Sequence, residues 1–406
     1  MRVSSKAPII AYIIPLVVVY LTVAQLRLFT PFISVAILYV IVMLVLFFID
    51  RKIITYSFFP WWVCFSAVMV LNSLMGDSYF SDIIEVLSTI FFISFSAITA
   101  NYCNNVKDNK LIEFLLVSFL ISVVYLTICS VVIDIGEPGI LRNATAMGYQ
   151  SDNSMLLLLQ LRGMSNYYLP HALPMLIPPL IMGIKNKELS FKFHFILYIV
   201  LASVLALIYV SYATTPLLFA ILFLVLSIFV KQGNLKNNIG TFLIVAFIFL
   251  PLLFSSEYLL SLLQSLDSIT GGEGELHSKI GMFQESITYG RATGDMEERL
   301  DLYDESAAFL QSNWLIGTNE KVGGHSFFLD TLSSLGIIGF IPLALLLYKQ
   351  LKYSLRFLPK SSHIYYYFSI LAGLLMFLFK SMNNWEMWLI LFCIVPLLTL
   401  KLSKTK

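Results

Sequence analysis

Long runs of apolar residues, separated by short polar segments, dominate this chain. A helix needs about 20 residues to cross the hydrocarbon core of a bilayer. Runs near that length lie at 8–26, 30–49, 58–76, 83–101, 111–134, 167–184, 192–211, 214–231, 240–257, 327–350, 364–381 and 385–402. This pattern predicts an all-α polytopic membrane protein with about 12 transmembrane helices. Prolines in the sixth run predict a kinked or partly unwound helix there; they are Pro170, Pro174, Pro178 and Pro179.

Composition supports a membrane protein and excludes a separate soluble domain. Of the 406 residues, 58% are hydrophobic and 12% are charged, and the mean hydropathy is +0.84, far from the average of soluble domains. The longest polar stretch, 258–326, is too short to fold alone, so we expect it to pack on the membrane part. The four cysteines occur singly, without the spacing of metal ligands. We expect no metal site, no cofactor and no nucleic-acid partner.

The basic residues predict the orientation. If the N-terminus is cytoplasmic, 18 of the 26 Lys and Arg residues fall in cytoplasmic segments and eight fall in outer segments. Cytoplasmic loops carry such an excess, and an even number of spans agrees with it. Arg2 and Lys6 precede the first run without a small-residue cleavage site, which predicts a retained helix and not a removed signal peptide. We therefore expect both termini in the cytoplasm.

Two outer loops are long, 135–166 and 258–326. We divide the chain into helices 1–9 with the first loop (1–257), a loop that carries candidate site elements (258–326), and helices 10–12 with a basic tail (327–406). In the second loop, residues at helical spacing predict an amphipathic helix of about four turns. These residues are Leu302, Ser306, Phe309 and Leu310.

Arg299 lies at the predicted start of this helix. A guanidinium there can form two hydrogen bonds with a phosphate, helped by the free N–H groups of a helix N-terminus. The alternative is an ion pair with Asp295 or Asp301, and charge favours it. The stretch 258–325 carries four basic and eleven acidic residues, so phosphate binding would depend on individually placed arginines.

Arg162 lies directly before the sixth run, at the outer edge of the membrane. A cation at that depth pairs with an acid or an anionic ligand, or snorkels to the interface. No acid lies next to Arg162 in the sequence, which favours an anionic ligand. Arg142 and Arg291 are weaker candidates of the same kind.

His325 follows Gly323-Gly324 and precedes the tenth run, so its ring can reach an interfacial cavity. Imidazole is suited to take a proton from a hydroxyl near neutral pH. The alternative is a histidine that caps the helix or hydrogen-bonds locally. His171, one turn into the sixth run, allows the same two interpretations.

Further polar groups lie at membrane depth in the last three runs. Asp330 lies in the tenth run, Lys380 ends the eleventh, and Asn383 follows it. Intramembrane charges are rare without a role, so these residues are secondary candidates. Asp330 and Lys380 can also simply pair with each other.

A specific pattern of polar, aromatic and glycine residues runs from 299 to 339. Its positions are Arg299, Tyr303, Asn313, Gly317, His325, Ser326, Leu329, Gly336 and Gly339. The pattern resembles the signature region of the bacterial O-antigen ligase and O-antigen polymerase family. Members have Trp at the position of Tyr303, Pro at that of Trp314 and Asn at that of Ser326.

Two further positions bear on this resemblance. Arg162-Gly163 is similar to the family's arginine in its other long outer loop. Where the family has an arginine at the outer start of the eighth span, this chain has Tyr212 after Ser211. That difference departs from the ligase pattern.

The resemblance implies a metal-independent glycosyltransferase on the periplasmic face of the bacterial inner membrane. The donor would be a glycan on undecaprenyl diphosphate, with Arg162, Arg299 and Arg291 holding the diphosphate. His325 would deprotonate the acceptor hydroxyl. Because of Tyr212 we favour polymerisation of polysaccharide repeat units over ligation to lipid A core or another acceptor; a more remote alternative is a transporter of the lipid-linked glycan. Besides this glycan and the bilayer, a chain-length regulator is a candidate partner.

Overall fold

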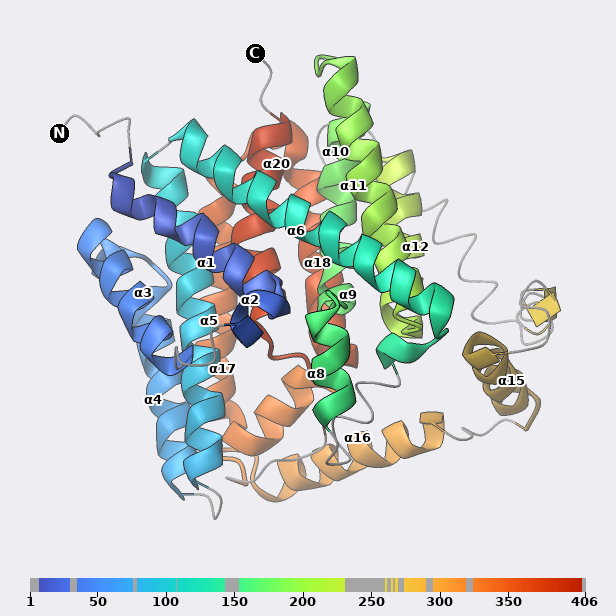
Figure 1. Ribbon diagram of the computed structural model, residues 1–406. Coiled ribbons are helices and arrows are strands. Elements are labelled where there is room, and N and C mark those ends of the chain that lie inside the picture. The colour runs from blue at the N-terminus through green and yellow to red at the C-terminus, as the bar shows by residue number, and fades with distance from the viewer. Residues whose placement is uncertain are drawn as a thin grey trace.

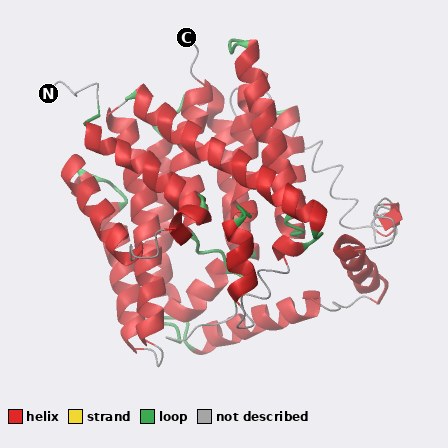
Figure 2. Cartoon of the chain, in the orientation of Figure 1, coloured by secondary structure: helices red, strands yellow, loops and turns green. Residues whose placement is uncertain are grey.

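The computed structural model describes residues 7–29, 35–75, 79–106, 108–142, 153–230, 274–289, 295–318 and 324–403, with a few more at 260, 264–265 and 267–268. Helices make up most of these residues, and no β-strand occurs among them (Figure 2). The predicted all-α class is therefore confirmed for the described part of the chain.

Six segments are long and apolar enough to cross a membrane. They are Ile83–Val106 within α5 (Tyr79–Val106), α6 (Asn109–Gly136), α11 (Phe191–Val210), α17 (Phe327–Leu355), Lys360–Phe379 with α18 (His363–Phe379), and Trp385–Ser403 with α19 (Trp385–Leu389), η6 (Ile390–Ile394) and α20 (Val395–Ser403). Five shorter apolar segments accompany them. They are Ile9–Thr22 with α1 (Ile13–Thr22), Val40–Ile49 within α3 (Val35–Ile49), α4 (Phe59–Met75), Leu169–Lys185 with α9 (Leu169–Ala172), η3 (Leu173–Leu176) and α10 (Ile177–Lys185), and α12 (Thr214–Phe229). The chain is a multi-pass membrane protein.

These segments account for eleven of the predicted apolar runs. The run at 240–257 lies outside the described residues, so a total of twelve spans stays a prediction. Large apolar side chains cover the outer surface of the helices. On α6, exposed residues recur three or four positions apart, namely Phe114, Val117, Ile121, Tyr125, Ile128, Val132 and Ile135. Such a stripe is expected where a helix faces lipid tails.

Both ends of the described chain lie at the top of Figure 1, and α16 (Asp295–Ser312) lies crosswise at the bottom. We call this lower side the α16 face. Among the long helices, α17 packs on α4, α4 packs on α5, and α6 packs on both α1 and α11. Helix α16 in turn packs on α17 near the start of that helix.

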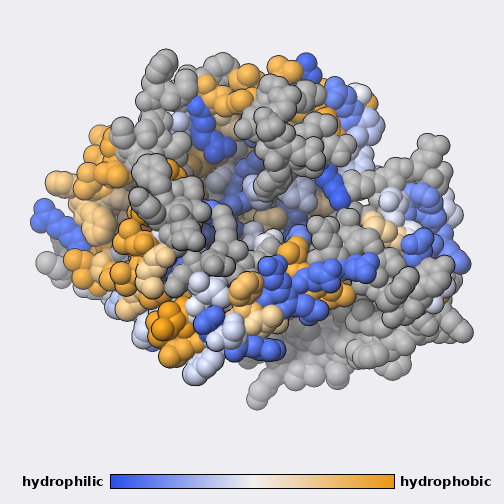
Figure 3. Space-filling view, turned by 90° about the horizontal axis from the view of Figure 1, so that it is seen from below, coloured by the Kyte–Doolittle hydropathy of each residue, from blue (hydrophilic) through white to orange (hydrophobic). Residues whose placement is uncertain are grey.

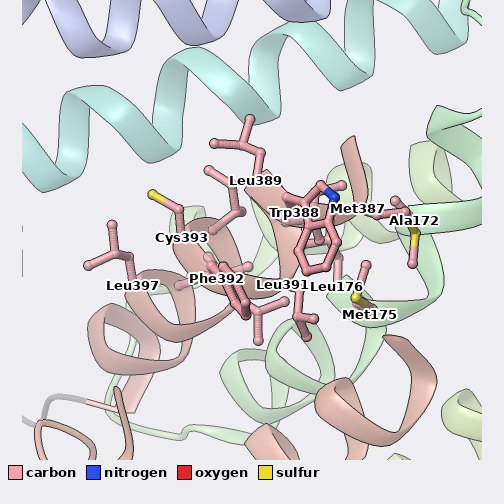
Figure 4. Close-up of a cluster of buried hydrophobic side chains, with 14 of the residues drawn as sticks. Ala172, Met175, Leu176, Met387, Trp388, Leu389, Leu391, Phe392, Cys393 and Leu397 are labelled. Atoms are coloured by element: carbon pink, nitrogen blue, oxygen red, sulfur yellow. The ribbon is translucent and has the colours of Figure 1, made fainter. Parts of the chain in front are cut away.

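The last span forms the centre of the core. Met387, Trp388, Leu391 and Phe392 have almost no exposed surface and lie close to η3 and its neighbours (Figure 4). A methyl group added at Gly373 of α18 would lie 2.7 Å from the Met175 sulfur. The helices therefore pack closely there, and an alanine at position 373 would require the Met175 side chain to shift.

Prolines break the sixth span as predicted. Its helix begins as α9, continues as the 3-10 segment η3 and becomes α-helical again in α10. Proline lacks an N–H and clashes with the preceding turn, which favours such breaks. The last span contains a π-helical segment, η6, that ends two residues before Pro396. The sequence analysis did not predict that second irregularity.

The predicted amphipathic helix is confirmed as α16, which has 18 residues. The same stretch also contains α15 (Gly274–Tyr289), which was not predicted. The short helices α2 (Ala24–Phe29) and α8 (Asn153–Leu161) complete the elements used below. The three-part division of the chain stays a prediction.

Candidate functional site

The α16 face is hollowed near its middle, and hydrophilic residues lie within the hollow (Figure 3). Of the main predicted site residues, Arg162 follows α8, Arg299 lies within α16, and His325 directly precedes α17. In Figure 1, α8 and α16 both lie on this side of the molecule. The contacts of these segments show which residues have structural roles.

Ser326 caps α17 and fixes the position of His325. Its Oγ accepts a hydrogen bond from the Leu329 N–H at 3.2 Å, and its carbonyl accepts one from the Asp330 N–H at 2.8 Å. A serine at this position satisfies an N–H that a helix start leaves free. His325 therefore lies immediately before a capped helix, as predicted, and its side chain is partly buried.

Asp330 ties the start of α17 to its surroundings. Its Oδ2 accepts hydrogen bonds from the N–H groups of Gly324 and Ser326 at 3.1 and 3.3 Å, and its Oδ1 accepts one from the Ser306 hydroxyl of α16 at 3.3 Å. Ser306 is fully buried, and its carbonyl accepts a hydrogen bond from the Ser333 hydroxyl at 2.7 Å. Asp330 thus holds the residues on both sides of His325 and anchors them to α16.

Lys380 and Asn383 lie beside this helix start. The Lys380 carbonyl accepts a hydrogen bond from the Phe327 N–H at 3.1 Å. Asn383 donates to the Thr89 hydroxyl of α5 at 2.6 Å and accepts from the Trp388 indole N–H of α19 at 3.0 Å. These two hydrogen bonds give Asn383 a structural role as a link between α5 and α19.

Helix α17 is interrupted at Gly336, which has φ 60° and ψ −171°. The turn that follows α16 fills the gap in its hydrogen bonding. The N–H groups of Ile337 and Ile338 donate to the carbonyls of Trp314 and Leu315 at 3.0 and 3.2 Å, and the Thr318 N–H donates to the Ser333 carbonyl at 3.1 Å. The backbone groups freed by the break are therefore satisfied by residues 314–318.

Gly317 and Gly336 lie at the centre of this crossing. A Cβ on Gly317 would lie 2.2 Å from the Ser334 carbonyl oxygen, and a Cβ on Gly336 would lie 2.4 Å from that of Leu315. No side chain fits at either position. The two glycines of the sequence pattern thus allow one backbone to cross another, which explains their spacing physically.

Arg162 follows α8 and has an exposed side chain. Gly163, with φ 90°, packs closely against Cys129 of α6 and Gln25 of α2. Gln25 donates to the Leu161 carbonyl at 2.9 Å and accepts from the Tyr125 hydroxyl at 2.7 Å. The backbone that carries Arg162 is therefore fixed on two helices.

Arg299 lies within α16, one turn after its first residue, Asp295. The free N–H groups of that helix start belong to the residues before Arg299. The side chain of Arg299 and the whole of Arg291 lie outside the described residues. Their predicted contact with a diphosphate stays a prediction.

His171 is completely buried and fits the local interpretation. Its Nδ1 lies 2.9 Å from the Tyr167 carbonyl, and its ring centroid lies 4.7 Å from that of Tyr167. Because a carbonyl only accepts, Nδ1 carries the proton in this contact. These contacts give His171 a packing role within α9.

Tyr212 joins two helix ends. Its backbone has φ 51°, which is uncommon for a bulky residue, and its hydroxyl donates to Oδ2 of Asp134 at 3.3 Å. The other Asp134 oxygen accepts from the Gly139 N–H at 2.9 Å. Burial and the Asp134 carboxylate raise the pKa of Tyr212, so the phenol keeps its proton and remains a donor.

Glu386 was not predicted from the sequence as a site residue. This residue lies in the first turn of α19 with 1% of its surface exposed. Its Oε1 accepts a hydrogen bond from the Asn166 side chain, and Arg27 of α2 is near enough to interact electrostatically. The sequence feature that could have identified it is an acidic residue at the start of an otherwise apolar run, where a charged side chain needs a partner.

Comparisons with known proteins give no relative. No protein-family model, no curated protein and no solved structure matches this chain. Function therefore rests on the residues and their contacts.

Proposed function

We propose that the protein is a membrane glycosyltransferase of the periplasmic face of a bacterial inner membrane. It transfers a glycan from undecaprenyl diphosphate onto another lipid-linked repeat unit and so polymerises a polysaccharide. Both termini are cytoplasmic, and the α16 face is periplasmic. The donor, the bilayer and a chain-length regulator are the proposed partners.

The observation that carries this proposal is the crossing of Gly317 and Gly336. The sequence pattern that resembles the family spans 299 to 339. Several of its positions belong to one local arrangement, in which the turn after α16 crosses α17. Gly317 and Gly336 allow the crossing, and Ser326, directly after His325, caps the helix that leads to it. A pattern with this physical basis supports the resemblance more strongly than isolated matching letters do.

The chemistry needs a good leaving group, positive charge and a base. Arg162, Arg299 and Arg291 bind the diphosphate and stabilise the negative charge that develops as its bond to the sugar breaks. His325 accepts the proton of the attacking hydroxyl as the new glycosidic bond forms. Undecaprenyl diphosphate leaves as a stable anion, so positioning of the reactants and stabilisation of charge suffice for transfer.

Deletion of the gene tests the proposal and separates its two forms. Loss of a polymerase leaves single repeat units on the core, because capping continues while elongation stops. Loss of a ligase leaves long lipid-linked glycan that never reaches the core. A deletion strain with normal surface glycan in both amount and length contradicts either form.

A second candidate function is transport of the lipid-linked glycan. Interrupted helices such as α17 and the α9–η3–α10 segment also occur in secondary transporters. Vesicles that contain the purified protein and labelled lipid-linked glycan distinguish the two. Transport moves the label across the bilayer with the bond between glycan and diphosphate intact, whereas transfer breaks that bond and releases undecaprenyl diphosphate.

A further inference from the structure

Glu386 connects two segments that are far apart in the sequence. Its carboxylate accepts a hydrogen bond from the side chain of Asn166, which follows Arg162 by four residues. The Oδ1 atom of Asn166 accepts a hydrogen bond from the Leu169 N–H at 2.9 Å. One asparagine thus joins the start of α9 to the first turn of α19.

The segment between Arg162 and Asn166 is also fixed on α6 and α2. The Ser165 N–H donates to the Ser130 hydroxyl of α6 at 2.9 Å, and Gly163 packs against α6 and α2. These contacts hold the segment on one side. The bond to Glu386 fixes it on the other side, against the last span.

The last span also contacts the helix that follows His325. Trp388, two residues after Glu386, packs edge-on against the Phe327 ring with centroids 5.8 Å apart. Phe327 follows His325 by two residues. A chain of direct contacts therefore runs from the Arg162 segment through Glu386 and Trp388 to the start of α17.

Burial makes this connection strong and costly to break. A carboxylate with 1% exposure cannot rely on water, and its Oε2 accepts no hydrogen bond from any residue that the structure describes. Loss of the Asn166 contact would leave a buried oxygen of the carboxyl group without its hydrogen-bond donor, which favours the connected arrangement.

We propose that Glu386 is a positioning residue, which holds the segment carrying Arg162 in a fixed place relative to His325. This inference rests on the proposed function, in which Arg162 binds the diphosphate and His325 takes the proton. Transfer requires both groups at the reacting centre, and a displacement of about 1 Å can reduce the rate roughly a hundredfold. Glu386 acts through Asn166 and Trp388 and does not itself touch the reacting atoms.

Four variants of the full chain in lipid nanodiscs test this role. Glu386→Ala removes the acceptor, whereas Glu386→Gln keeps a carbonyl that accepts from Asn166. Asn166→Asp sets two carboxylates against each other, and the double variant Asn166→Asp with Glu386→Gln restores the bond with its direction reversed. Glu113→Ala is the control, because Glu113 pairs with Lys401 and its side chain is half exposed.

The first measurement is amide hydrogen exchange in residues 163–169, which needs no activity. We expect exchange there to be about tenfold faster in Glu386→Ala and Asn166→Asp. Glu386→Gln, the double variant and the Glu113 control should match the wild type. Unchanged exchange in Glu386→Ala overturns the structural link.

The second measurement is release of undecaprenyl diphosphate from the lipid-linked glycan extracted from the producing cells. We expect kcat to fall about a hundredfold in Glu386→Ala and to recover within threefold in the double variant. A double variant as inactive as Glu386→Ala shows that the charge of Glu386 acts directly and overturns the positioning role. If the wild type releases none, the proposed function fails, while the exchange experiment still decides whether the link exists.

Discussion

Gly336→Ala should disrupt the crossing between α17 and the turn after α16. The new Cβ would lie 2.4 Å from the Leu315 carbonyl oxygen and 2.5 Å from its carbon, and both atoms belong to the backbone. The residue would also have to keep φ 60° and ψ −171°, which costs a non-glycine residue roughly 1–3 kcal/mol. The crossing must therefore open.

Opening the crossing removes three backbone hydrogen bonds, those from Ile337, Ile338 and Thr318. Each contributes about 1 kcal/mol. Because opening the crossing also releases the backbone strain at residue 336, we expect a local destabilisation of roughly 3 kcal/mol. Because the start of α17 carries His325, transfer activity should also fall sharply.

Hydrogen exchange and thermal unfolding in detergent measure this effect. Peptides that cover 314–318 and 333–339 should exchange much faster in Gly336→Ala than in the wild type. Gly136→Ala is the matched control, because a Cβ there meets nothing within 4 Å; its stability should change by less than about 1 kcal/mol. Wild-type exchange in both peptides and an unchanged Tm for Gly336→Ala would refute the steric reasoning.

Four other changes have defined outcomes. His325→Ala should lower transfer by a factor of about 10² to 10⁴ without changing membrane insertion; normal glycan length in that strain would count against a base. Arg299→Lys should be nearly as damaging as Arg299→Ala if the guanidinium forms two bonds with phosphate, and full activity of the lysine variant in a transfer assay would argue for a surface ion pair. EDTA should leave transfer unchanged, and loss of product would indicate a metal. Hydrogen bonds from the N–H groups of Ala7, Lys110 and Leu111 lower the pKa of Asp108, so its stabilisation is present above the unfolded value of about 4 and is lost as pH falls further. Asp108→Ala should thus cost about 1 kcal/mol in thermal unfolding at pH 7, and the difference from wild type should shrink at pH 3; an equal difference at both pH values contradicts the assignment.

Periodicity predicted what depends on local sequence. Apolar runs located the helices because a membrane helix must be apolar along its whole length. The prolines at 170–179 predicted the broken sixth span because proline acts on its own turn. The amphipathic spacing around Ser306 predicted α16 for the same local reason.

Features that depend on distant partners could not be predicted. For Asp330 the sequence left open a functional role or a pair with Lys380, and it did not predict that the Asp330 oxygens accept hydrogen bonds from Ser306, Gly324 and Ser326. The positive φ of Gly336 could not be predicted, because it depends on the backbone of Leu315 packing against it. Glu386 lies within the predicted apolar run 385–402, and its partner Asn166 lies 220 positions away in the sequence, so their contact could not be predicted.

The most direct test of the account is release of undecaprenyl diphosphate by the purified protein from a defined lipid-linked oligosaccharide. The account predicts that the wild type releases it together with a longer lipid-linked glycan, and that His325→Ala releases neither at a comparable rate. Equal release by both proteins would contradict the role of His325. Passage of intact substrate across the bilayer without any release would contradict a transferase altogether.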